Sequence, residues 1–339
     1  MTYALAKKTT EIISSTDSEN FGLLYSRLQE IQIKDKNKDK KPFETLRKLV
    51  AKSKVIYENQ QPVIKAIEKR CNFLLDTAIS QGSGYLNFSL KVDWRFVIGL
   101  GNPSVLDTGL RLHPIYGFPY LPGQGLKGAI RRVWMLETAE KLGIPLLEVA
   151  KIKMRKDAKN KTPWERFENL LMTAVNPDSK EYAAEKSRID QDFSNLQNDI
   201  FVGEKTRIRE LRYEEFWNEY ASFYQLVFGS TNGQGKVDFL DVYPTELIIG
   251  GKSILEVDII NAHYGEYYTS EGKTPPADYL SPNPIFFLCV KKDTPFQFRA
   301  IFKDKAKEQK AKIEKLIIST GEDYGFGAKT MSGYGEMYK

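Results

Sequence analysis

Histidine and cysteine are scarce in this chain, with 2 of each among 339 residues. Cys71, His113, His263 and Cys289 are far apart in the sequence, so a zinc cluster is not expected. Metal-free RNA cleavage relies most often on histidine as general acid or base. The small histidine count therefore argues against a nuclease of that kind, and we expect no metal, no cofactor and no catalytic residue.

Long apolar segments and a strong excess of one charge are also missing. There is no run of about 18 apolar residues, which excludes a membrane-spanning helix, and residues 1–11 lack the apolar core of a signal peptide. The 50 Lys and Arg side chains exceed the 44 Asp and Glu side chains only slightly, for a formal net charge of +6. These features predict a cytoplasmic protein. They also predict that its nucleic-acid contact is a local basic groove within an assembly shared with other subunits.

The richest local signal is a glycine segment near the C-terminus, residues 325–335, which reads GFGAKTMSGYG. Glycine permits positive φ, and successive backbone N–H groups in such a loop form a concavity suited to anions. Lys329 adds a charge, while Phe326 and Tyr334 offer rings on which a base could stack. A tight surface turn is the alternative interpretation. The candidate RNA-binding residues here are Gly325, Gly327, Lys329, Thr330, Gly333 and Gly335.

A second signal is a proline–glycine turn that opens a helix, residues 119–134. Apolar residues from Leu126 to Trp134 fall on one stripe, while Lys127 and Arg131 share another face. The start of such a helix favours an anion. The lysine precedes the last glycine, so the segment is not a nucleotide P-loop. The candidate RNA-binding residues here are Gly123, Gln124, Gly125, Lys127, Gly128, Arg131 and Arg132.

Periodicity divides the chain into an N-terminal helical extension, residues 1–84, and one domain, residues 85–339, with a helical insertion at about 143–229. Helices are predicted over 21–33, 43–79, about 125–142, about 206–228 and 303–319. Alternation over Leu86–Ile98 predicts one strand with a polar face suited to lying along RNA. Further strands are predicted at 237–242, 254–260 and 336–338, and a hairpin of 285–291 with 296–302. Without the insertion this is the ferredoxin-like, split βαβ order of an α+β fold, shared with RNA-recognition motifs.

The two glycine segments together resemble those of the RAMP superfamily of CRISPR-associated RNA-binding proteins. The family's proline–glycine turn and helix correspond here to Pro122-Gly123-Gln124-Gly125-Leu126-Lys127-Gly128-Ala129-Ile130-Arg131, where Gln124 and Gly125 replace the usual small hydroxyl residues. The segments 237–244, 257–264 and 275–284 further resemble sixth subunits of type III-B Cmr effector complexes. The resemblance implies a non-catalytic subunit of a ribonucleoprotein in antiviral defence, which holds guide and target RNA near the guide 3′ end beside other RAMP subunits.

The remaining candidates are two histidines and some acids. His113 follows the first strand at a place where some repeat-cleaving RAMP relatives carry catalytic residues, but a structural hydrogen bond or an RNA contact is favoured. Glu256 and Asp258 share one face of a predicted strand, and a metal pair there is the less favoured alternative. The long loop 261–283 is a candidate for RNA or subunit contact through His263, Tyr264, Tyr267 and Tyr268.

Three functional hypotheses remain open at this point. The first is the RNA-binding subunit, the second is a stand-alone repeat-processing endoribonuclease, and the third is an interaction scaffold without direct RNA contact. The basic cluster at 151–156 is either a solvated face or a nucleic-acid or partner contact. Few histidines favour the first hypothesis over the second, and two basic glycine segments favour it over the third.

Overall fold

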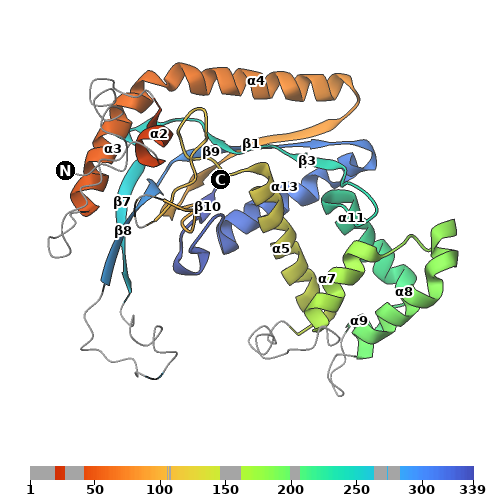
Figure 1. Ribbon diagram of the computed structural model, residues 1–339. Helices are drawn as coiled ribbons and strands as arrows, with labels where there is room; N and C mark the ends of the chain where they lie inside the picture. The colour runs from red at the N-terminus through yellow and green to blue at the C-terminus, as the bar shows by residue number, and fades with distance from the viewer. Residues whose placement is uncertain are drawn as a thin grey trace, which may run out of the picture.

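The computed structural model describes residues 20–26, 42–104, 106, 108–145, 162–198, 207–262, 273 and 283–339. Helices and antiparallel sheets are mixed, which confirms the predicted α+β class (Figure 1). In the described N-terminal residues the helices are α2 (Phe21–Ser26), α3 (Pro42–Asn59) and α4 (Gln61–Ser80). Pro62, which lacks an N–H, stands in the first turn of α4, where that donor has no helical partner in any case.

The larger sheet has five strands in the order β10-β1-β9-β3, with β4 also pairing with β9. All its pairings are antiparallel. The bounds are Gly84–Val92 (β1), Val237–Phe239 (β3), Tyr243–Pro244 (β4), Pro295–Phe302 (β9) and Met337–Tyr338 (β10). On β9, Phe296, Phe298 and Phe302 are fully buried on one face, where Phe298 also contacts Phe326 with ring centroids 5.4 Å apart.

A second sheet has the order β2-β8-β7, where β2 is Arg95–Phe96, β7 is Leu255–Ala262 and β8 is Asn283–Lys291. The predicted hairpin of 285–291 with 296–302 is therefore wrong, because β8 and β9 belong to different sheets. The alternation of each strand was visible in the sequence, but the short connection between them suggested pairing. β8 pairs instead with β7, and a two-stranded ribbon of β5 (Ile248–Ile249) and β6 (Lys252–Ser253) lies between β4 and β7 in the chain.

The predicted strand Leu86–Ile98 is interrupted, and the interruption links the two sheets. β1 ends at Val92, the chain bends at Asp93–Trp94, and β2 starts at Arg95 in the second sheet. Alternation of apolar residues continues through the bend, so the pattern alone did not reveal it. As a result Trp94, expected on the buried face, is 43% exposed.

Helices cover both faces of the larger sheet (Figure 1). α5 (Gly123–Leu142) and α13 (Lys310–Ser319) lie on one side, and α4 runs across the other. Arg299 of β9 is only 3% exposed. Burial lowers the pKa of this guanidinium, and Cys71 and Glu68 of α4 partly offset the effect. α4 thus covers the part of this face around Arg299, whereas Asn87 and Lys91 of β1, on the face expected to lie along RNA, remain exposed.

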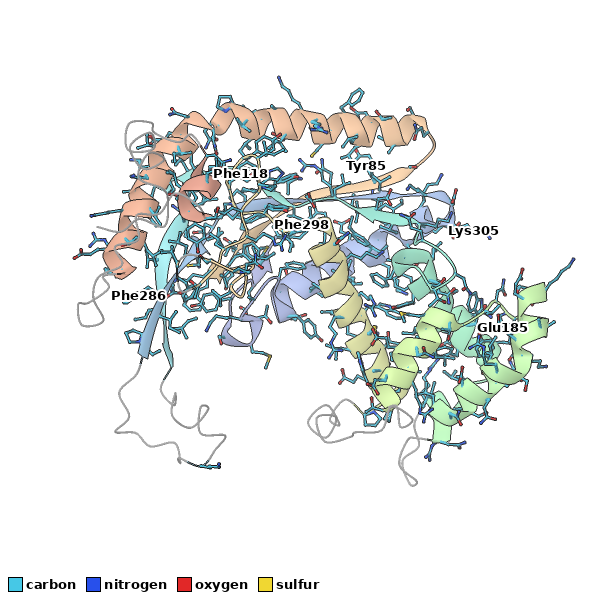
Figure 2. The ribbon with its side chains drawn as sticks, in the orientation of Figure 1. Tyr85, Phe118, Glu185, Phe286, Phe298 and Lys305 are labelled. Atoms are coloured by element: carbon cyan, nitrogen blue, oxygen red, sulfur yellow. The ribbon has the colours of Figure 1, made fainter. Side chains whose placement is uncertain are left out.

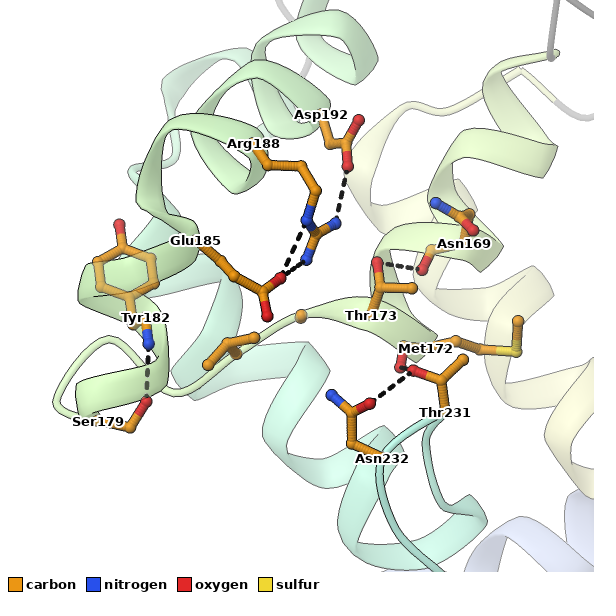
Figure 3. A network of polar contacts seen from close by, with 12 residues as sticks. Asn169, Met172, Thr173, Ser179, Tyr182, Glu185, Arg188, Asp192, Thr231 and Asn232 are labelled. Atoms are coloured by element: carbon orange, nitrogen blue, oxygen red, sulfur yellow. Dashed lines mark hydrogen bonds and ion pairs between the residues drawn. The ribbon is translucent and has the colours of Figure 1, made fainter.

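The insertion is helical in the part that the structure describes. It comprises α7 (Pro163–Thr173), α8 (Lys180–Asn198), the short helices α9 (Arg207–Glu210) and α10 (Tyr213–Phe216), and α11 (Ser222–Phe228). The predicted helix 206–228 is wrong as a single element, because a π-helical turn at Trp217–Ala221 and a break after Glu210 divide it. Figure 3 shows Arg188 of α8 between Glu185 and Asp192, and Thr231 bonded to the carbonyl of Met172.

The predicted helix 303–319 begins with a 3₁₀ segment, Asp304–Gln309, before α13. A π-helical turn, Thr320–Tyr324, then leads into the glycine segment. Among the helices that the structure describes, none combines the length and the apolar character needed to cross a membrane.

Candidate nucleic-acid interface

A carboxylate from the connection between β3 and β4 fixes the proline–glycine turn. α5 begins at Gly123, and the Gly123 N–H donates to Oδ1 of Asp241 at 2.7 Å. A Cβ on Gly123 would lie 2.1 Å from the carbonyl oxygen of Phe239, so only glycine fits against the end of β3. The first N–H of the helix, expected to face an external anion, is therefore already paired. In the described residues, the N–H groups of Gln124 and Gly125 have no hydrogen-bond acceptor.

Two other glycines of this segment are less constrained. A Cβ on Gly125 would touch Cδ1 of Leu121 at 3.2 Å, and a Cβ on Gly128 would meet nothing within 4 Å. Gly128 is therefore not required by packing, and its surroundings leave room for another molecule.

The three candidate RNA-binding cations of α5, Lys127, Arg131 and Arg132, have different environments. Arg131 donates through Nε to the Tyr224 hydroxyl at 2.7 Å and forms an ion pair with Glu168, so it joins α5 to α11 and α7. Arg132 lies over the ring of Trp164, with Cζ 4.4 Å from the centroid. Partial burial lowers the pKa of the Lys127 ammonium, and the nearby Arg131 lowers it further. Lys127 and Arg132 form no ion pair with a carboxylate of the described chain, so their charge is not neutralised there.

The C-terminal glycine segment packs tightly against β2. Gly325, Gly327, Gly333 and Gly335 all have positive φ. A Cβ on Gly327 would lie 2.3 Å from the Val97 carbonyl oxygen, and one on Gly335 would lie 1.8 Å from that of Phe326. The N–H groups of Ala328 and Gly335 donate to the carbonyls of Val97 and Arg95. Most of the loop is thus held by the protein itself, as the tight-turn interpretation requires.

The exposed part of this segment is its tip. Lys329 has φ of 60°, in the left-handed region, and starts a 3₁₀ turn, Thr330–Ser332. Met331 is 100% exposed. The Lys329 ammonium lies 5.6 Å from the Tyr334 ring centroid and has no carboxylate partner in the described part of the chain. The tip therefore presents an unneutralised cation to solvent.

The two rings expected to stack on a base are not available for that role. Phe326 is fully buried, and Tyr334 is 5% exposed with its hydroxyl donating to Asp258 Oδ2 at 2.6 Å. Burial, followed by this bond, raises the pKa of Tyr334. Trp94 is the exposed ring beside the loop, with its centroid 5.0 Å from that of Tyr334. Sequence reasoning missed Trp94 because the alternation placed it on the buried face.

Glu256 and Asp258 share a face of β7, as predicted, and both contact Arg95. Arg95 Nε lies 2.6 Å from Glu256 Oε1, and NH1 lies 2.9 Å from Asp258 Oδ2. Asp258 also accepts the bond from Tyr334. The described residues contain no group of three or more His, Cys, Asp or Glu side chains that could hold a metal ion. These acids instead fix the guanidinium of Arg95, which belongs to the same sheet as β7.

His113 belongs to an aromatic cluster beside the start of α5. Its Nδ1 accepts from the N–H groups of Ile115 and Tyr116 at 3.2 and 3.3 Å. Its ring stacks on Tyr116 at 4.5 Å, while Phe118, labelled in Figure 2, lies 5.9 Å away. Burial lowers the His113 pKa, opposed by Asp241. The loop histidine thus makes structural hydrogen bonds, and the RNA contact proposed for it stays a prediction.

Backbone hydrogen bonds, together with short stretches of chain between them, link the two glycine segments. Ala328 donates to Val97, and Arg111 donates to Ile98. His113 then donates to Phe118, and Leu121 exchanges two bonds with Val242. The path ends one residue away, where Asp241 holds the turn of α5. The bends after β2 and before α5 therefore place both segments on one connected set of loops.

Several predicted contacts lie outside the described residues. These are His263, Tyr264, Tyr267, Tyr268 and the basic cluster 151–156, and they stay predictions.

Comparisons with known proteins find several similar chains. The CRISPR system Cmr subunit Cmr6 of Pyrococcus furiosus is 33% identical over 252 residues, 73% of this chain and 66% of that protein. The alignment thus spans just under two thirds of the relative. The chain is also similar to one chain in a structure of the type III-B Cmr-beta complex bound to cognate target RNA (TM-score 0.48, 16% identity, 91% of this chain and 78% of that chain). Crystalline Cmr6 from P. furiosus gives a TM-score of 0.38 with 29% identity over 76% of this chain and 98% of that chain.

The RAMP superfamily matches residues 82–338, from just before β1 to the last strand. Both glycine segments and both sheets fall within this match, whereas α2, α3 and α4 precede it. By this match, the chain belongs to the RAMP superfamily.

Proposed function

We propose that the chain is a non-catalytic RNA-binding subunit of a type III-B CRISPR effector complex. Its partners are guide RNA, target RNA and other RAMP subunits, and its place is near the guide 3′ end. The observation that carries the RNA-binding part is the connected set of loops on which both basic glycine segments lie. The similarity to Cmr6 supports the assembly part.

The strand order supports a finer proposal about the fold. In the larger sheet, β1, β3, β9 and β10 follow one another in the sequence, with α5 after β1 and α13 after β9. Their spatial order, β10-β1-β9-β3, interleaves the two βαβ units. We therefore assign a ferredoxin-like core, with α4 covering part of the outer sheet face and leaving Asn87 and Lys91 exposed there.

The cations available at these loops are suited to sequence-independent phosphate contact. Lys329 lies at the exposed tip of the C-terminal segment, and Lys127 and Arg132 lie on α5 without a carboxylate partner among the described residues. Contacts of this kind position the RNA backbone but do not read bases. In an RNA-guided complex the sequence is read by base pairing, so such a subunit needs no base-specific readout.

The test is RNA affinity against salt concentration, measured by fluorescence anisotropy on the full chain with unstructured single-stranded RNA. Lys329→Gln and Lys127→Gln should each reduce the slope of log K against log salt by about 0.7, the value for one phosphate contact on a single strand. Lys186→Gln, an exposed residue of α8, is the matched control and should leave the slope unchanged. Unaltered slopes in both test variants would overturn the RNA-binding assignment.

The absence of catalysis is proposed from the same geometry. The Nδ1 of His113 already accepts two backbone N–H bonds, and the paired acids Glu256 and Asp258 are bound by Arg95. Purified chain incubated with repeat RNA, with and without Mg²⁺, should leave the RNA intact. Cleavage by wild type that disappears in His113→Ala would establish the endoribonuclease alternative.

The assembly part has its own test. Co-expression with the other subunits of a type III-B complex, followed by affinity purification through a tag on this chain, should recover those subunits together with guide RNA. Recovery of the chain alone would overturn the subunit assignment.

A further inference from the structure

Trp94 differs from the other tryptophans of the chain. Trp134 is buried, and Trp164 and Trp217 are partly buried against the hydrophobic core. Trp94 is 43% exposed, at the bend between β1 and β2 where the chain passes from one sheet to the other. An indole that is 43% exposed forgoes a substantial part of the free energy that its full burial would release, so this place on the surface is unfavourable for folding alone.

The exposed indole is supported from within the protein. The guanidinium of Arg95 lies over it, with Cζ 4.8 Å from the ring centroid, and Tyr334 lies beside it at 5.0 Å. Arg95 and Tyr334 both bond to the same carboxylate, that of Asp258, which is only 9% exposed. One carboxylate therefore fixes both supports relative to each other beside the indole, of which 43% remains exposed to solvent.

A cation adjoins this aromatic surface. Lys329 lies over the Tyr334 ring, and Gly333, whose added Cβ would stand 3.8 Å from Trp94 Cε3, brings the loop tip against the indole. A flat, rigid ring beside an unneutralised ammonium matches the two parts of a nucleotide, a base with a π face and a phosphate. Single-strand binding proteins combine these same two elements.

We propose that Trp94 is a stacking platform for an unpaired base of bound RNA, with an adjacent phosphate of the same strand at Lys329. This inference rests on the proposed RNA-binding function and adds a site to it: an unstacked single-stranded nucleotide at the junction of the two sheets. Arg95, Glu256, Asp258 and Tyr334 are positioning residues that hold the platform and do not contact the RNA.

Three variants test the proposal against single-stranded RNA at one salt concentration. Trp94→Ala should weaken binding roughly 5- to 150-fold, the range for loss of one base–aromatic stack. Trp94→Phe, which keeps a ring, should recover most of the affinity. Phe73→Ala, which removes an aromatic ring 69% exposed on α4, is the matched control and should bind as wild type does. Circular dichroism melting of each variant identifies any loss of folded protein.

A second readout is specific to stacking. RNA should quench the tryptophan fluorescence of the wild type, and Trp94→Phe should lose this quenching while still binding. An RNA with abasic sites along its length keeps the phosphates but should bind the wild type as weakly as intact RNA binds Trp94→Ala.

The outcomes separate the two proposals. Wild-type affinity in Trp94→Ala, together with a reduced salt slope in Lys329→Gln, would overturn the platform and leave RNA binding standing. If Trp94→Ala binds RNA as tightly as wild type but no longer recovers other subunits in the affinity purification, the stacking platform is overturned and Trp94 is a protein contact. Failure of the wild-type chain to bind any RNA would overturn both.

Discussion

The carboxylate of Asp241 accepts a hydrogen bond from the backbone N–H of Gly123, 118 residues earlier in the sequence. The same carboxylate accepts from the Tyr243 hydroxyl at 3.2 Å. A side chain from the segment between β3 and β4 therefore caps α5, a role that a residue just before the helix usually has.

Removal of this cap should destabilise the fold. Asp241→Ala is expected to lower the free energy of unfolding by about 1–2 kcal/mol, because the Gly123 N–H and the Tyr243 hydroxyl both lose an acceptor. Urea denaturation measures the change. Asp241→Asn keeps an acceptor oxygen and should retain most of the stability; equal losses in the two variants would show that the charge, not the bond, matters.

Two glycines of the C-terminal segment form a matched pair. Gly333 and Gly335 have φ of 81° and 80°, so alanine meets similar backbone strain at both, about 1–2 kcal/mol. Only at Gly335 would the added Cβ collide with a backbone carbonyl. Gly335→Ala should therefore cost about 1–3 kcal/mol more than Gly333→Ala in denaturant unfolding. Equal costs would mean that the loop relaxes without loss.

The contact of Arg131 with Glu168 should be measurable as a coupling. A double-mutant cycle with Arg131→Gln and Glu168→Gln is expected to give about 0.2–1 kcal/mol, because both side chains are partly exposed to solvent. The pair Arg207–Glu219, whose side chains are 54% and 42% exposed, is the comparison and should give a smaller value. A coupling of zero would indicate that Glu168 does not neutralise Arg131, whose charge would then be available to RNA.

His113 should make stability depend on pH in a defined direction. Because burial lowers its pKa in the folded state, the unfolded chain binds the proton first as pH falls below about 6.5. Stability should therefore decrease on acidification from pH 7 through the unfolded pKa. His113→Asn keeps an acceptor for the Ile115 and Tyr116 N–H groups but does not titrate, so its unfolding free energy should vary less over that interval.

The local pattern predicted individual elements well where one face of the element is buried. Leu86 and Leu90 are buried as alternation required, and α5 has its apolar stripe, with Leu126, Ile130 and Val133 buried. Pairing between strands was harder, because β8 and β9 are each apolar and adjacent in the chain yet join different sheets. Which strand pairs with which is decided by long-range packing, which one sequence does not display.

The candidate site was predictable in its backbone and less so in its side chains. Glycines at positive φ were expected in the C-terminal segment, and all four have it. Phe326 was expected to offer an exposed ring and Trp94 to be buried, but Phe326 is buried and Trp94 is exposed. Exposure of a ring depends on what the neighbouring sheet covers, and α4, α5 and the second sheet all contribute from distant parts of the chain.

Helix α4 lies outside the superfamily match but inside the folded core. The superfamily match begins at residue 82, after α4 ends at Ser80, yet the side chains of Ile64, Ile67 and Cys71 are buried in the same core as the sheet. A fragment trimmed to the match would expose Arg299 and the apolar surface around it to water. The segment that homology delimits is therefore shorter than the segment that folds, and an expression boundary for this chain belongs before α3.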